Sequence, residues 1–200
     1  MKSLNLDQEL NITTSDISPI FYQDTHLHRY EPTLYEHLTI LLEHYTLLPT
    51  DHLIDYGCGK GRLNFYFHHF CQCQTTGIEM DESLFEDALE NLNTYQQKHR
   101  LSPLAITFEN TYAQTYCILP SQNKFYFFNP FSVQLFIKVI NQILLSYETS
   151  PRPLDLILYY PLADYLNYLD TCTLFEPVLH LNLPNAHKDS RECFIIYRLT

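Results

Sequence analysis

Residues Leu53–Arg62, with the sequence LIDYGCGKGR, decide the fold class. The apolar segment His52–Tyr56 is expected to form a short buried strand. Three of the chain's four glycines follow it within five residues, at Gly57, Gly59 and Gly61. Glycine adopts positive φ at little cost and lets a ligand approach the backbone. A strand, a glycine-rich turn and a helix N-terminus therefore predict a ligand-binding loop beyond the carboxyl end of the strand.

Strand and helix patterns alternate along the rest of the chain. Further strands are expected at Cys73–Glu79, Leu104–Phe108, Lys124–Phe128, Leu154–Tyr160, Leu174–Leu183 and Cys193–Leu199. Helices are expected at Thr33–Leu48, Lys60–Phe70, Glu82–Gln97, Ser132–Tyr147 and Ala163–Leu169, with a weaker helical segment at Thr111–Ile118. The alternation predicts an α/β, doubly wound, mostly parallel seven-stranded sheet with helices on both faces. No helix separates the last two strands, so a terminal hairpin is expected to put one antiparallel strand at the end of the sheet.

The chain is expected to form one domain, residues 33–200, preceded by a polar and irregular N-terminal extension or lid, residues 1–32. Thr33 and Glu36 have the spacing of a capping box, so Thr33 is expected to begin the first helix of the domain. Pro49 is expected to end that helix.

The composition is that of a globular chain, with 46% hydrophobic and 18% charged residues. The formal net charge of −11 disfavours a nucleic-acid partner, because such a field repels phosphate backbones, although a local basic patch would escape this argument. The sequence has no apolar run long enough to span a bilayer and no signal-peptide pattern, so a cytoplasmic protein without a membrane partner is expected. The six cysteines form no CxxC pair, and no metal site is indicated.

Two cofactor classes compete for the glycine loop. A dinucleotide site uses the pattern GxGxxG, with a helix N-terminus at the pyrophosphate. Here the spacing is GxGxG, and Arg62 occupies the position of the third glycine of the dinucleotide pattern. Asp55 lies two residues before Gly57, where a carboxylate suits an amine-bearing or cationic ligand better than a pyrophosphate. Lys60 and Arg62 are expected to lie at the start of a helix, with side chains that face solvent.

The segment Asp55–Gly61 resembles the first motif of the class I S-adenosylmethionine-dependent methyltransferases, a family with a Rossmann-like fold. In motif order the resemblance covers roughly residues 30–160. It implies S-adenosyl-L-methionine as the cofactor, with Asp55 near its amino-acid end. It also implies that the loop backbone at Gly57, Cys58, Gly59 and Gly61 passes beside the cofactor.

Further cofactor contacts follow from the same resemblance. Glu79 ends the second expected strand, 18 residues past Gly61, where the family has an acidic residue that accepts both ribose hydroxyls. Met80 resembles the apolar residue that packs on the adenine. Glu109 or Asn110, after the third expected strand, corresponds to a polar residue that contacts the adenine. The spacing does not decide between these two, and Asn110 is the one we assign.

The stretch Tyr30–Tyr35 precedes the first expected helix. Some members of the family use a similar stretch to close over the methionine end of the cofactor. The resemblance thus implies Tyr30, Thr33 or Tyr35 as cofactor contacts, of which we assign Tyr30 and Thr33, and an aromatic face would suit a sulfonium charge. The capping role of Thr33 stays open beside this one, and the two are compatible.

The sequence NPF at residues 129–131 ends the fourth expected strand and resembles the [DNS]PP[FY] motif of amine-methylating members of the family. The resemblance makes Asn129 and Phe131 the candidate catalytic residues. Asn129 would accept hydrogen bonds from a planar amine, beside the cofactor, and Phe131 would stack on the acceptor. One proline stands where the motif has two, so a strand-ending turn explains the sequence equally well. Tyr160, at the end of the fifth expected strand, receives no role.

These patterns predict an S-adenosylmethionine-dependent methyltransferase that acts on a small molecule or a protein, with an amine nitrogen as one candidate for the methylated atom. Methyl transfer from a sulfonium depends mainly on positioning, so the lack of an obvious general base does not argue against catalysis. Three alternatives stay open. They are a methyltransferase-like module that binds the cofactor without catalysis, an RNA methyltransferase, and an NAD-dependent oxidoreductase, which Arg62 disfavours.

Overall fold

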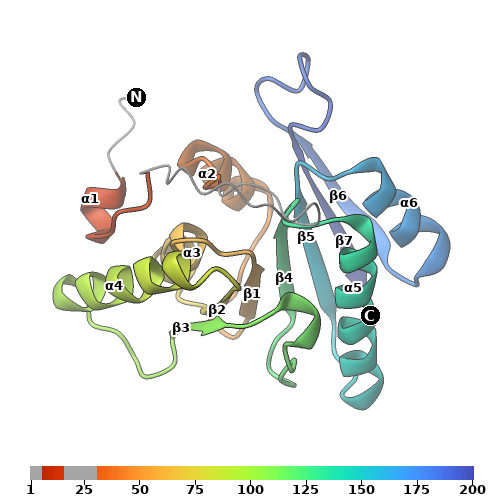
Figure 1. The fold of residues 1–200 in the computed structure, drawn as a ribbon. Helices are drawn as coiled ribbons and strands as arrows, with labels where there is room; N and C mark the ends of the chain where they lie inside the picture. Colours follow the sequence, from red (N-terminus) through yellow and green to blue (C-terminus); the bar gives the residue numbers. More distant parts are fainter. Residues whose placement is uncertain (1–5, 16–30) are drawn as a thin grey trace.

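A computed structural model describes residues 6–15 and 31–200, and its centre is one seven-stranded sheet with the strand order β3-β2-β1-β4-β5-β7-β6 (Figure 1). The strands are β1 His52–Tyr56, β2 Gln74–Glu79, β3 Ile106–Asn110, β4 Lys124–Phe128, β5 Leu154–Tyr159, β6 Glu176–Asn182 and β7 Cys193–Leu199. The helices are α1 Leu6–Leu10, α2 Tyr35–His44, α3 Arg62–Cys71, α4 Glu82–Lys98, α5 Val133–Thr149 and α6 Ala163–Cys172, with a 3-10 turn η1 at Ala113–Thr115. Strands β1 to β5 pair in parallel, whereas β7 pairs antiparallel with both β5 and β6.

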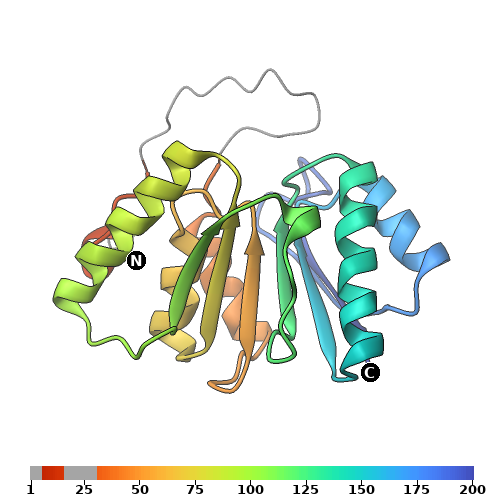
Figure 2. The same ribbon diagram turned by 60° about the horizontal axis from the view of Figure 1, so that its bottom comes forward.

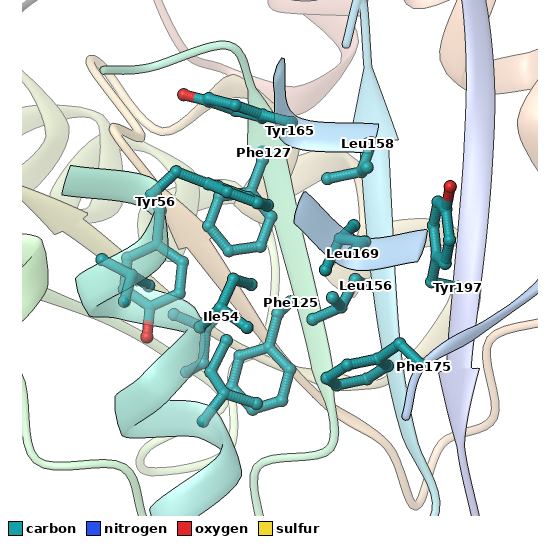
Figure 3. Packing of buried hydrophobic residues seen from close by; sticks show 14 of the residues in the cluster. Ile54, Tyr56, Phe125, Phe127, Leu156, Leu158, Tyr165, Leu169, Phe175 and Tyr197 are labelled. Carbon is teal, nitrogen blue, oxygen red and sulfur yellow. The ribbon is translucent and has the colours of Figure 1, made fainter. Parts of the chain in front are cut away.

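Alternate residues of the central strands pack on opposite faces of the sheet. On one face, Ile54 of β1, Phe125 of β4 and Leu156 of β5 belong to a buried cluster with residues of α5 and α6 (Figure 3). On the other face, Leu53 of β1 and Tyr126 of β4 pack with residues of α2 and α3. Figure 2 shows α4 and α5 at opposite ends of the row of parallel strands. Burial on both faces explains why these strands have nearly continuous apolar sequences.

The predicted sheet is confirmed, and three strands have their predicted bounds: His52–Tyr56, Lys124–Phe128 and Cys193–Leu199. The terminal hairpin is also confirmed, but its antiparallel strand β7 lies between β5 and β6 and not at the end of the sheet. The third strand begins at Ile106 and not at Leu104, because Leu104 has a φ of 63° in an exposed turn.

The predicted capping box is wrong. Helix α2 begins at Tyr35, its N-cap residue is Leu34, and no side chain caps it. Thr33 Oγ1 lies instead 2.8 Å from the hydroxyl of Tyr126, so a partner from the sheet has replaced the local one. The helix ends at His44, ahead of Pro49. Within residues 6–15 and 31–200, no helix has both the length and the hydropathy needed to cross a membrane.

The described part of the N-terminal extension is irregular at residues 11–15 but includes a short helix. It contains α1, and the side chain of Leu10 at the end of α1 is fully buried. Leu10 and Ile12 pack in one cluster with Phe65 of α3 and Tyr95 of α4. This segment therefore forms part of the helical layer that covers β3.

Candidate functional site

The glycine loop lies at the carboxyl end of β1, and its glycines have positive φ: 81° at Gly57, 53° at Gly59 and 82° at Gly61. Other residue types adopt this conformation only at a cost. Space is also restricted, because a Cβ at Gly61 would lie 2.5 Å from Cζ of Phe108, and one at Gly57 would lie 3.0 Å from Cβ of Pro130. The loop therefore presents bare backbone at the edge of the sheet where doubly wound folds bind ligands.

Glu79 ends β2 and is tied to this loop. Its Oε2 accepts a hydrogen bond from the N–H of Gly59 at 2.9 Å. Its Oε1 accepts from the N–H groups of Met80 at 2.9 Å and Asp81 at 3.0 Å. Burial raises the pKa of Glu79, and these three N–H groups oppose that shift. An ionised carboxylate has about four acceptor positions, so a vicinal diol would bind there by exchange with one backbone hydrogen bond.

Asp55 belongs to β1, which is the neighbour of β2 in the sheet. It lies opposite Gly77 of β2, two residues before Glu79. Burial and the charge of Glu79 raise the pKa of Asp55 to about 8. Asn64 of α3, in the amide orientation that satisfies both of its polar atoms, donates to Asp55 Oδ2 at 3.1 Å and accepts from the N–H of Gly77 at 3.2 Å. The hydrogen bond from Asn64 favours the ionised form of Asp55. A cationic ligand group would favour it further.

A small cavity opens beside Asp55. Its walls come from residues 31–33, from the end of β1 and the glycine loop, from the start of α3 and from β4. The lining residues are Glu31, Pro32, Thr33, Asp55, Gly57, Cys58, Arg62, Leu63, Tyr126 and Phe128. The cavity thus brings together Thr33, Asp55, Gly57 and Cys58 of the predicted cofactor contacts. Glu79 lies outside its lining and is linked to it through the loop.

The prediction that Arg62 and Lys60 face solvent is wrong, because each residue is only 7% exposed. The guanidinium of Arg62 donates hydrogen bonds to Thr14 Oγ1 at 2.7 Å, Ser15 Oγ at 3.0 Å and the carbonyl oxygen of Thr33 at 3.3 Å. Arg62 therefore joins the N-terminal segment to a wall of the cavity.

Asp7 of α1 completes this network. Its Oδ1 lies 3.9 Å from Nη2 of Arg62, and its carboxylate accepts hydrogen bonds from Tyr35 and from both the N–H and the hydroxyl of Thr14. Burial opposes ionisation, but the hydrogen bonds from Tyr35 and Thr14 lower the pKa of Asp7. The guanidinium of Arg62 also lies 4.6 Å from the ring centre of Tyr35, a cation–π distance. The network therefore holds residues 6–15 and 31–35 together at the cavity.

The predicted adenine contacts gather around Glu79. Asn110 of β3 lies opposite Glu79 of β2 in the strand register. Its Nδ2 donates a hydrogen bond to the carbonyl oxygen of Glu79 at 3.0 Å. Both Asn110 and Glu109 are exposed, and Met80 is half-buried. Of the two candidates that the spacing left open, Asn110 is the one with a hydrogen bond to Glu79. Contact with an adenine stays a prediction for Met80 and Asn110.

The predicted acceptor residues differ in their surroundings. Asn129 follows β4 with a φ of 41°, and its Oδ1 is buried without a hydrogen-bond partner among the described residues. Such a buried acceptor is costly unless another donor satisfies it. Phe131 is 3% exposed, lies edge-on to Phe127, and its carbonyl oxygen accepts a hydrogen bond from Tyr165. Stacking of Phe131 on an acceptor would require its ring to leave the core.

One predicted cofactor contact, Tyr30, lies outside the described residues.

Two other residues of the site, Asn64 and Tyr126, were not predicted from the sequence. Asn64 was the one polar residue in the sequence LNFYF of α3, and that contrast was a signal for a buried partner. Tyr126, which lines the cavity, is part of the apolar run KFYFF, where nothing distinguishes a site residue from a core residue.

No family model and no curated protein matches this sequence. The fold is similar to that of an RNA methyltransferase from Salinibacter ruber in complex with S-adenosyl-L-homocysteine, with 19% identity, a TM-score of 0.53 and coverage of 85% of this chain and 93% of that chain. It is also similar to a SAM-dependent methyltransferase from Aquifex aeolicus (14% identity, TM-score 0.56, coverage 79% and 86%). An rRNA methylase from Streptococcus thermophilus gives 13% identity, a TM-score of 0.54 and coverage of 86% and 98%. These likenesses show that the chain has the Rossmann-like fold of these methyltransferases.

Proposed function

We propose that this chain is an S-adenosylmethionine-dependent methyltransferase. The observation that carries the proposal is the position of Asp55 and Glu79, which lie near the carboxyl ends of neighbouring strands beside a loop of positive-φ glycines. These carboxylates suit the two polar parts of the cofactor, its ammonium group and its ribose hydroxyls. Each carboxyl group, in its ionised form, would repel a pyrophosphate in the same place, which disfavours a dinucleotide.

The residues of the site have distinct roles in this proposal. When bound, S-adenosyl-L-methionine supplies a methyl group on a positively charged sulfur. Asp55 accepts hydrogen bonds from the ammonium group, and Glu79 accepts them from the ribose. Met80 and Asn110, which adjoin Glu79, contact the adenine. The enzyme then contributes mainly by holding donor and acceptor close and in line.

The N-terminal region has a role in the same proposal. Thr33 lines the cavity, and Tyr30 is assigned to the methionine end of the cofactor on sequence grounds alone. Residues 1–32 act as an extension that helps to close the site, and residues 33–200 form the methyltransferase domain. Arg62, which binds residues on both sides of the segment 16–30, supports this assignment.

The proposed acceptor is a small molecule or a protein, and an amine nitrogen is the candidate atom. Asn129 is the residue that supports this choice, because its buried Oδ1 can accept a hydrogen bond from an N–H group. Phe131 follows it at the end of the same turn, and its enclosed ring anchors the turn in the core. A cytoplasmic location fits the six cysteines, all of which are free thiols.

The test is a transfer assay with radiolabelled S-adenosyl-L-methionine and cell extract separated into RNA, protein and small molecules. We expect label in the protein or small-molecule fraction, and Asn129→Ala should reduce the rate by about tenfold. Glu148→Ala, an exposed change on α5, is the matched control. Binding of the cofactor without transfer to any fraction would instead establish a binding module.

An RNA methyltransferase is the second candidate. It is favoured by the similar fold of the RNA methyltransferase from Salinibacter ruber. The net charge of −11 opposes it, because binding of phosphates depends on clustered positive charge. Label in the RNA fraction, with affinity that falls steeply as salt increases, would support it over the first proposal.

A further inference from the structure

The ends of β4 and β5 form an aromatic and acidic surface next to the cavity that contains Asp55. We propose that this surface, defined by the exposed Glu31 and the half-buried Phe128 and Tyr160, with the buried Glu192 beside Tyr160, binds a positively charged amine, which becomes the methyl acceptor once it is deprotonated. The inference rests on the proposed function, and it names the class of acceptor: an amine that binds in its ammonium form, as a free amine or as a lysine side chain. Before transfer the ammonium group loses a proton to water. The lone pair of the neutral nitrogen then forms the new C–N bond while the bond between sulfur and the methyl group breaks, and S-adenosyl-L-homocysteine leaves.

The surface is continuous with the cavity. Phe128, at the end of β4, and Glu31 both line the cavity together with Asp55. The ring centre of Phe128 lies 6.0 Å from that of Tyr160 and 4.4 Å from that of Tyr159. Phe128 and Tyr160 are both half-buried, so part of each ring is accessible. An acceptor bound on these rings would lie on the side of the cavity that Phe128 lines. Glu79, the proposed ribose contact, is not part of the cavity lining.

The backbone at this place has unusual conformations. Asn129 follows β4 with a φ of 41°, and Tyr160 follows β5 with a φ of 50°. Neither residue is glycine, so each conformation costs free energy, and such costs concentrate at functional sites. The buried Oδ1 of Asn129, which has no partner among the described residues, is a second and independent sign of a donor at this edge. An ammonium group supplies such donors.

The charges around the two rings are predominantly negative. Burial, a hydrogen bond to Glu192 and the nearby charges of Glu192, Asp189 and Glu31 raise the pKa of Tyr160 to about 12, so its phenol stays neutral. Two cations lie near these groups. Arg191 forms an ion pair with Asp189 at 2.7 Å, and Arg62, which lines the cavity, donates hydrogen bonds to Thr14, Ser15 and Thr33.

His37 does not add a positive charge to this surface. Its Nε2 lies 3.5 Å from Glu192 Oε1, and its Nδ1 lies 2.7 Å from the hydroxyl of Tyr159. Burial lowers the pKa of His37, despite the opposing charges of Glu192 and Glu36. The imidazole is therefore neutral near pH 7. Glu192 is only 7% exposed and lies beside His37 and Tyr160, so Glu31, which is exposed, is the carboxylate of this surface that a ligand can reach directly.

This combination favours a cation over RNA. Aromatic faces attract ammonium groups, and the attraction increases where water is partly excluded. Carboxylates beside the rings add to the attraction for a cation, and they repel a phosphate backbone. An uncharged acceptor would gain nothing from Glu31 or Glu192.

The test is calorimetric titration of the full chain, with and without saturating S-adenosyl-L-homocysteine, using three probes: spermidine, a lysine-containing peptide and total tRNA. We expect spermidine or the peptide to bind, and the one that binds identifies the source of the ammonium group. Glu31→Gln should weaken this binding about fivefold. Phe128→Leu should weaken it by a similar factor because the aromatic face is lost. Glu176→Gln, an exposed change at the start of β6, should leave it unchanged.

The outcomes separate the two proposals. Binding of tRNA alone, or no binding of either amine at millimolar concentration by a protein that binds S-adenosyl-L-homocysteine, overturns the amine surface and leaves the cofactor site standing. Amine binding that Glu31→Gln and Phe128→Leu both leave intact, in variants with unchanged thermal unfolding, also overturns it. If the amines bind and S-adenosyl-L-homocysteine does not, the proposed function fails while the cation-binding surface remains.

Discussion

Asp55 combines a cost in stability with a proposed role in binding. Its pKa in the folded protein is about 8, against an ordinary value of 3.8, because burial and Glu79 disfavour its charge. The folded state therefore favours the protonated form. The stabilisation from this preference is complete below pH 3.8 and is lost as the pH rises through 8. A cationic ligand group would recover it by pairing with the ionised carboxylate.

Replacement of Asp55 should separate these two effects. In Asp55→Asn the side chain cannot ionise, so the variant should lose less thermal stability than the wild type between pH 6 and pH 9. The same variant should bind S-adenosyl-L-methionine about tenfold more weakly, since a charge-assisted hydrogen bond is lost. Thermal melts at both pH values test the first expectation, with Asp164→Asn, an exposed change on α6, as control. Identical pH dependence in the variant and the wild type would contradict it.

Gly61 should be the least replaceable glycine of the loop. A methyl group there would lie 2.5 Å from the ring of Phe108, and φ is 82°. Gly61→Ala should therefore reduce the free energy of unfolding by about 2 kcal/mol. Gly57→Ala is the matched comparison, because its φ is 81° but its closest contact is 3.0 Å, so it should cost less. Denaturant melts of the two variants give the order, and a reversed order would count against this loop geometry.

At the scale of elements, the N-terminal segment depends on a few polar contacts made by Arg62 and Asp7. Asp7→Asn should weaken this network and release α1 from α3. We expect faster hydrogen exchange in residues 6–15, and an affinity for S-adenosyl-L-methionine about threefold lower because Thr33 shares the network. Asp164→Asn, an exposed change on α6, is the control. Unchanged exchange in residues 6–15 would show that hydrophobic packing of Leu10 alone holds the segment.

Strands were predictable from the sequence to a greater extent than the segments that depend on distant partners. β1 and β4 are short runs buried on both faces and bounded by turn residues, so local pattern sets their bounds. The sequence around Thr33 predicts that its side chain caps a helix. In the structure this side chain instead forms a hydrogen bond with the hydroxyl of Tyr126, a residue distant in sequence. The burial of Arg62 depends on contacts with Asp7, Thr14 and Ser15. These residues are distant from Arg62 in the sequence, so the pattern of the glycine loop could not predict them.

At the scale of the molecule, the strand order explains where the site lies. The chain proceeds from β1 outward to β3 and then returns to β4 on the other side of β1. This reversal leaves a crevice at the carboxyl ends of β1 and β4, as expected for a doubly wound sheet. Asp55 and the glycine loop lie on one side of it, and Phe128 and Asn129 lie on the other. Alternation of elements predicted the sheet, but it could not predict that β7 lies between β5 and β6.

The central claim is that this crevice binds S-adenosyl-L-methionine, and calorimetric titration with its demethylated product, S-adenosyl-L-homocysteine, tests it most directly. We expect one site per chain with micromolar affinity, weakened at least about tenfold by Asp55→Ala and by Glu79→Ala. Glu148→Ala, an exposed change on α5, serves as the control. Absence of binding at millimolar ligand, or wild-type affinity in both variants, would contradict the claim.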